Sequence, residues 1–229
     1  LRALLSLDLS LKQSSLFNLP FSPSSITASS ISTHGSWLAL CGQSPRETCE
    51  LHVLDLRRPF KPQIHLHNLD TRHISSPIGQ MTSSKGTLQV AFHPDEELFF
   101  VLFSHPAFAS FSWGWRASVA CFETHTGRPV WHAEIDAEIT SDARSIADLD
   151  KDPHFIPAIT CHKNHLYINT MDGGIATLDA RDGALIHTHH HASIHGIVEM
   201  HYLEDTQQLI MLNEAGMLSV KALHLDAKS

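Results

Sequence analysis

Long apolar runs are missing from this sequence, and no segment approaches the about 20 residues that are needed to span a bilayer. The most hydrophobic stretch, Leu98 to Phe103, has only the length of a strand. Asn-x-Ser/Thr acceptors are missing too, which favours an intracellular chain, in the cytoplasm or nucleus, over a lumenal one. The sequence starts at Leu1 rather than Met, so we expect a fragment or a processed product, and no membrane insertion of this segment.

Basic residues are in the minority. Lys and Arg number 16 against 24 Asp and Glu, which gives a net charge of -8. A general nucleic-acid binder needs a basic face to neutralise phosphates. Only Arg57, Arg58 and Lys61 lie close together, and so short a run is typical of a solvated strand end. The charge therefore argues against a nucleic acid as the partner.

The motifs of catalysis and cofactor binding are also absent. There is no G-x-S-x-G nucleophile elbow, no G-x-x-x-x-G-K-[ST] phosphate loop and no G-x-G-x-x-G fingerprint. Aspartates crowd together between Asp142 and Asp152, but the central glycine and closing glutamate of a calcium loop are not at the required positions. The sequence therefore predicts no catalytic residue and no cofactor.

Cysteine is scarce, and none of Cys41, Cys49, Cys121 and Cys161 belongs to a CxxC pair, so a zinc ribbon or a thioredoxin-type site is not indicated. Cys41 and Cys49 flank a turn, and a disulfide across that hairpin is geometrically conceivable. Sequence separation alone leaves the bond open. An oxidised pair would favour a lumenal location, and four free thiols a cytosolic or nuclear one.

Short apolar runs bounded by Gly, Pro, Asn, Asp and Ser are abundant, whereas helical periodicity is nearly absent, and this pattern is typical of strands. An isolated strand at 3–9 and a Ser- and Pro-rich loop at 13–25 come first. The following runs form clusters, each the size of one four-stranded antiparallel sheet. We therefore predict an all-β fold, a single β-propeller domain with blades at about 25–68, 88–135, 155–191 and 197–223.

A repeat supports this prediction, because an acidic residue, a glycine and a ring residue recur at the same spacing. The two copies are Glu123, Gly127, Trp131 and Asp179, Gly183, His187. An acidic side chain at a strand end can accept backbone N–H bonds in the following turn. The glycine supplies the positive φ that reverses the chain. The ring residue of the next strand can then pack against a neighbouring sheet.

The segment from His165 to Gly183 resembles the repeat of pyrroloquinoline-quinone-type (PQQ-like) propellers and, more loosely, the WD-repeat blade. Asp172-Gly173 matches the first turn of that signature, and Asp179 with Gly183 matches the second. The resemblance covers roughly residues 115–190 and implies the fold. Members that bind the quinone carry an adjacent Cys-Cys pair and a set of calcium ligands, and this sequence has neither, so the resemblance does not extend to the cofactor.

The resemblance implies six to eight blades, more than the clusters found here. Blades are missing from this chain, or have diverged, or a partner or a further chain segment completes the ring. The strand at 3–9 could close the circle by pairing with the last cluster, which ends one strand short. Such closure would remove exposed sheet edges.

Histidines form one candidate site. His187, His189 and His191 would project from one face of a strand, and His195 could add a further metal ligand. No carboxylate or cysteine completes a familiar ligand spacing, so solvated strand-end histidines are the simpler interpretation.

Aromatic residues form the second candidate site, in an insert at 108–116 where a short turn would suffice. Its Phe111, Trp113, Trp115 and Arg116 are residue types enriched at protein-binding hot spots, although aromatic residues more often fill a core. We therefore predict a non-catalytic protein–protein interaction scaffold within a larger complex, with other proteins as partners. A lumenal sensor or receptor domain and a metal-dependent enzyme using the histidines at 187–195 stay open as alternatives.

Overall fold

The computed structural model describes residues 3–8, 13–18, 25–43, 49–57, 62–67, 88–109, 112–135, 158–170, 174–189, 197–213 and 215–222. Every regular element in these ranges is a strand. They contain no helix of the length and apolarity that a membrane span requires. The fold of the described residues is all-β, as the strand pattern predicts.

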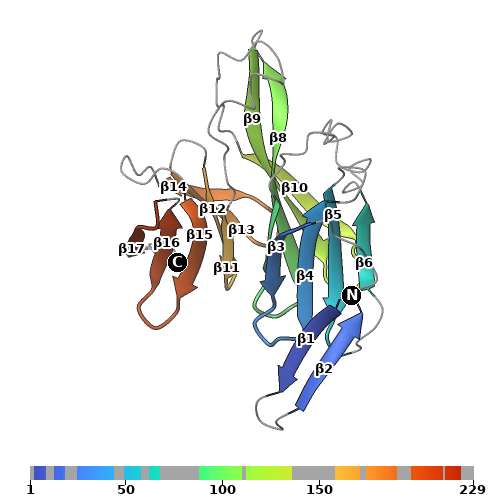
Figure 1. The fold of residues 1–229 in the computed structure, drawn as a ribbon. Coiled ribbons are helices and arrows are strands. Elements are labelled where there is room, and N and C mark those ends of the chain that lie inside the picture. Colours follow the sequence, from blue (N-terminus) through green and yellow to red (C-terminus); the bar gives the residue numbers. More distant parts are fainter. Residues whose placement is uncertain are drawn as a thin grey trace.

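The strands form one hairpin followed by four antiparallel sheets, each with its strands in sequence order (Figure 1). The hairpin pairs β1 (Ala3–Asp8) with β2 (Gln13–Asn18). Sheet 1 contains β3 (Ser25–Ile31), β4 (Trp37–Gln43), β5 (Cys49–Asp55) and β6 (Pro62–His67). Sheet 2 contains β7 (Leu88–Phe92), β8 (Leu98–Ala109), β9 (Ser112–Glu123) and β10 (Pro129–Ile135). Sheet 3 contains β11 (Ile159–His162), β12 (His165–Asn169), β13 (Ile175–Asp179) and β14 (Leu185–His189). Sheet 4 contains β15 (Ile197–Leu203), β16 (Gln208–Asn213) and β17 (Leu218–Ala222).

The N-terminal end differs from the prediction. Residues 13–18, expected in a loop, form β2, and β1 pairs with β2 instead of closing a ring with sheet 4. In this hairpin Leu4 lies opposite Phe17 and Leu5 opposite Leu16, so both strands gain apolar cross-strand neighbours. Closing the short connection between them costs much less chain entropy than pairing with a sheet near the other end of the chain.

Consecutive sheets pack face to face, and the alternation of side chains along each strand supplies both faces. In β8, Phe99, Val101 and Phe103 contribute to the core shared with sheet 1, whereas Phe100 and Leu102 contribute to the core shared with sheet 3. All five are at most 1% exposed. A strand buried on both faces needs a continuous apolar run, which explains why this stretch is the most hydrophobic in the sequence.

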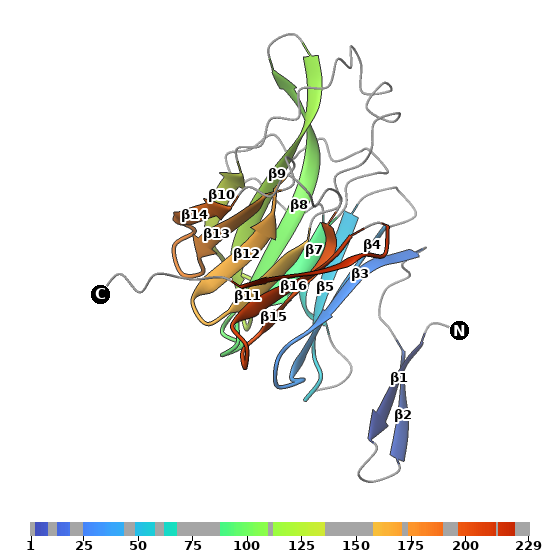
Figure 2. The same ribbon diagram turned by 90° about the vertical axis from the view of Figure 1, so that its left-hand side faces the viewer.

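The first strands of the four sheets lie next to one another in the order β3, β7, β11 and β15. Figure 2 shows the sheets fanning out from these strands. Within the described residues no comparably extensive contact joins β15 back to β3. The four sheets therefore form an open arc of blades about a common axis.

The turns confirm the repeated unit. The amide N–H of Gly127 donates to the Glu123 carbonyl over 2.8 Å, and that of Gly183 donates to the Asp179 carbonyl over 3.0 Å. Both glycines have the expected positive φ, 69° and 75°. The Asp179 carboxylate accepts the Arg181 amide at 2.7 Å, as predicted for the acidic residue, whereas the Glu123 carboxylate accepts hydrogen bonds from the side chains of Thr126 and Arg128. The other turn of the resemblance, Asp172-Gly173, lies outside the described residues.

Candidate functional site

The two central strands of sheet 2 continue past their neighbours as an isolated ribbon. Strand β7 pairs with β8 only along Leu88–Phe92, and β10 pairs with β9 only between Ala117 and Phe122. Beyond these contacts, residues 105–109 of β8 and 112–116 of β9 pair only with each other in the described part of the chain. We call this ribbon the β8–β9 arm, and Figure 1 shows it projecting at the top of the view.

The register of the β8–β9 arm sorts its residues onto two faces. Phe108 lies opposite Trp113 and Pro106 opposite Trp115, so these four positions belong to one face. The positions of the other face are His105, Ala107, Ala109, Ser112, Gly114 and Arg116. The backbone thus assigns the two predicted tryptophans to the same face and the predicted Arg116 to the opposite one. Phe111, the fourth predicted residue, lies outside the described residues.

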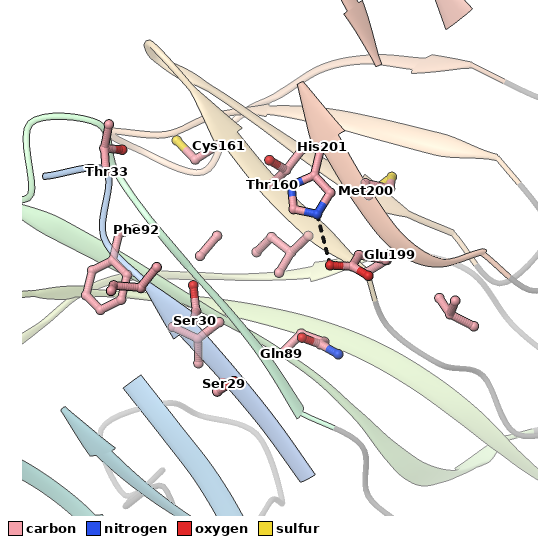
Figure 3. A pocket seen from close by; sticks show the side chains of 16 residues that line it. Ser29, Ser30, Thr33, Gln89, Phe92, Thr160, Cys161, Glu199, Met200 and His201 are labelled. Atoms are coloured by element: carbon pink, nitrogen blue, oxygen red, sulfur yellow. Dashed lines mark hydrogen bonds and ion pairs between the residues drawn. The ribbon is translucent and has the colours of Figure 1, made fainter. Parts of the chain in front are cut away.

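A polar channel runs along the first strands of the four sheets. Its volume is about 270 Å³, and residues from β3, β7, β11 and β15 line it (Figure 3). Ser30, Gln89 and Thr160 contribute polar groups, and His201 lies 2.9 Å from the Glu199 carboxylate. Sequence reasoning missed this channel, because its lining comes from four segments that meet only in the folded chain.

Two of the four predicted metal ligands fall within the described residues. His187 and His189 lie on β14 with their ring centroids 4.0 Å apart. His191 and His195 lie outside the described residues. In the described part of the chain, no group of three or more His, Cys, Asp or Glu side chains is arranged to hold a metal ion. The histidine site therefore stays a prediction.

The register of sheet 1 bears on the cysteine pair. Cys41 lies opposite Leu51, and Cys49 lies opposite Gln43, so the two cysteines are diagonal neighbours. Diagonal neighbours in a sheet are about 7–8 Å apart. The Cα separation in a disulfide is usually about 4.4–6.8 Å. This register does not favour the bond that would support the lumenal alternative.

An arc of antiparallel sheets whose first strands line a central channel is a β-propeller architecture, and the predicted fold class is confirmed. Solved propeller structures share it. Hydrazine synthase of Kuenenia stuttgartiensis superimposes with a TM-score of 0.61 at 15% identity, over 99% of this chain and 66% of that one. Neither a family model nor a curated protein sequence matches the chain.

Two further structures are similar. The β-propeller domain of Myceliophteria thermophila Cps50 (Swd1) gives a TM-score of 0.57 at 16% identity, over 97% of this chain and 59% of that one. The Dos1 propeller gives 0.58 at 11% identity, over 92% and 47%. The chain thus spans about two thirds of the first of these three proteins and less of the other two. Likeness at such low identity concerns the fold alone.

Proposed function

We propose that this chain is a non-catalytic protein–protein interaction scaffold, built from PQQ- or WD-type blades, that works as a subunit or domain of a larger complex. The β8–β9 arm carries the proposal. An isolated two-stranded ribbon is marginally stable in water, and the register assigns Trp113 and Trp115 to a single face. Tryptophan is among the residues that dominate binding energy at protein interfaces. A protein partner that covers this face would supply apolar contacts to the two tryptophans.

The state of the described thiols supports a non-catalytic role. Burial raises the pKa of the Cys121 thiol to about 12 and also raises that of Cys161, which lines the channel. Both thiols therefore stay protonated near neutral pH, and a protonated thiol is a poor nucleophile.

The experiment is quantitative affinity purification of the protein with mass spectrometry of the proteins that co-purify. We expect a stable set of partners for the wild type. A Trp113→Ser, Trp115→Ser double variant should lose that set, because the aromatic face of the arm would be gone. His105→Ser, on the opposite face of the same ribbon, is the matched control and should retain it. If the double variant and the control retain the same partners, the arm is not the binding surface.

A further inference from the structure

In the described part of the chain, the last sheet has one strand fewer than the other three. Sheets 1 to 3 each contain four strands, and sheet 4 contains β15, β16 and β17. Among the described residues, β17 pairs with β16 on one side and with no strand on the other. An open strand edge presents backbone N–H and C=O groups that are ready to pair with an added strand.

On the face of sheet 4 that points away from sheet 3, the part formed by β16 and β17 is apolar, whereas β15 contributes Glu199 and His201. Strand register places Ile210 opposite Val220 and Leu212 opposite Leu218, while the intervening Leu209 and Met211 pack into the core with sheet 3. Leu218 is 65% exposed and Val220 is 54% exposed. In sheets 1 to 3 the corresponding face is covered by the following sheet, so the apolar face of sheet 4 continues an existing series of interfaces.

The ring residue of the repeat indicates which kind of strand would complete sheet 4. In sheet 2, Trp131 donates from Nε1 to the Ala180 carbonyl of sheet 3 over 3.1 Å and lies against Gly183. That turn leads into the fourth strand of sheet 3. His187 occupies the same position in the next copy. It pairs with Thr177, on the face of sheet 3 that turns toward sheet 4, and it is exposed. Among the described residues, no turn of sheet 4 contacts His187 in the way that the turn with Ala180 and Gly183 contacts Trp131.

We infer that β17 accepts a fourth strand supplied by a partner protein. The strand runs antiparallel to β17, its alternate apolar side chains extend the face formed by Leu218 and Val220, and a glycine-containing turn ahead of it meets His187. The chain's own fourth strands define this occupant, because β10 and β14 each follow a turn with glycine at positive φ, Gly127 and Gly183. The inference deepens the proposed binding function by naming a second surface, separate from the β8–β9 arm.

The probe is a fluorescein-labelled peptide with the sequence of residues 179–189, which contains such a turn and strand. Fluorescence anisotropy should show saturable binding to the 229-residue protein, with a Kd below about 1 mM. Val220→Arg should weaken binding at least tenfold. Val130→Arg is the matched control, because Val130 is 46% exposed on the outer strand of a complete sheet, and it should bind like the wild type.

A proline scan of the peptide tests the mode of binding independently of the variants. A strand that pairs along one edge uses alternate N–H groups, so proline should abolish binding at every second position and be tolerated between them. The Trp113→Ser, Trp115→Ser variant should bind the peptide normally, which separates failure of this edge from failure of the arm. Absence of saturable binding or equal effects of the two arginine variants would overturn the inference. So would a dimer of the protein in which β17 pairs with a second copy in place of the peptide.

Discussion

Gly183 lies at a point where two constraints meet. Its φ of 75° belongs to the left-handed region, and an added Cβ atom would lie 2.6 Å from Cε3 of Trp131. The glycine is therefore required both by its own backbone and by the sheet packed against it. Because the ring belongs to sheet 2 and the glycine to sheet 3, one residue spacing produces both the turn and the contact between blades.

Gly183→Ala should destabilise the fold more than Gly216→Ala. Both glycines have a φ of 75°, but nothing lies within 4 Å of the Cβ position at Gly216. The left-handed backbone costs an alanine about 1–2 kcal/mol at either site. Overpacking against Trp131 should add about 1–3 kcal/mol at Gly183 alone. Denaturant unfolding of both variants measures the difference, and equal losses would contradict the contact.

A double-mutant cycle isolates this contact. Trp131→Leu removes the ring and its hydrogen bond to Ala180, so Gly183→Ala should cost less free energy of unfolding in that background than in the wild type. We expect a coupling energy of about 0.5–3 kcal/mol, the range for residues in contact. Additive effects of the two substitutions would mean that sheets 2 and 3 do not meet at this point.

At the scale of elements, Glu96 joins the first turn of sheet 2 to the first turn of sheet 1. It lies between β7 and β8 with a φ of 63°. Its buried carboxylate accepts hydrogen bonds from the Ser32 hydroxyl and, over 2.9 Å, from the His34 amide. The backbone conformation is one that glycine adopts more easily. The side chain offsets that cost by bridging two blades.

The Glu96 bridge should make stability pH-dependent. Burial opposes the charge of Glu96, but hydrogen bonds from Ser32, Ser36 and the His34 amide outweigh it, so its pKa lies below the ordinary 4.5. A carboxyl whose pKa is lowered on folding stabilises the fold above its unfolded pKa, and this contribution is lost as pH falls through the folded pKa.

Glu96→Gln, which cannot ionise, should therefore be less stable than the wild type near pH 7 by about 1 kcal/mol or more. The difference should shrink as the pH falls through the lowered pKa of the folded wild-type carboxyl, because that carboxyl then also becomes protonated. Chemical denaturation at several pH values measures it. A difference that stays constant across this range would rule out a charged Glu96 bridge.

Most elements were predictable because a local signal encodes each one. The predicted bounds of Pro129–Ile135 agree with β10, and the positive φ of Gly127 and Gly183 follows from the repeat. The β1–β2 hairpin was missed because Gln13, Ser14 and Ser15 lack an apolar run, and only pairing makes them a strand. The sequence predicted an insert where the structure has the β8–β9 arm. The arm begins where β7 and β10 stop pairing with β8 and β9, and the sequence of the arm itself does not encode that point.

At the scale of the whole molecule, the sheet at the end of the open arc is packed less extensively than the sheets in its middle. Sheets 2 and 3 have neighbours on both faces, whereas sheet 4 packs on sheet 3 alone in the described residues. Local stability in proteins follows the density of buried apolar contacts. Eight large hydrophobic residues are exposed among the side chains that the structure describes, and four of them belong to sheet 4 or the turn before β17: Leu203, Met217, Leu218 and Val220.

Amide hydrogen exchange should reflect this inequality. We expect the slowest exchange in β9 and β12, which are central strands of the inner sheets, and the fastest exchange within the four sheets in β17. The protection factors of the two groups should differ by at least tenfold, which corresponds to about 1.4 kcal/mol. Uniform protection across the four sheets would show that they unfold as one unit and that the end of the arc is no weaker than its middle.

The central claim is that one sheet unit recurs around a common axis, with the ring of Trp131 in sheet 2 packed on the Gly183 turn of sheet 3. Nuclear Overhauser effects between the indole protons of Trp131 and the α protons of Gly183 test it most directly. We expect strong cross-peaks, because the ring lies against that glycine, and slow exchange of the indole N–H bonded to the Ala180 carbonyl. Missing cross-peaks together with a rapidly exchanging indole N–H would contradict the stacking of blades.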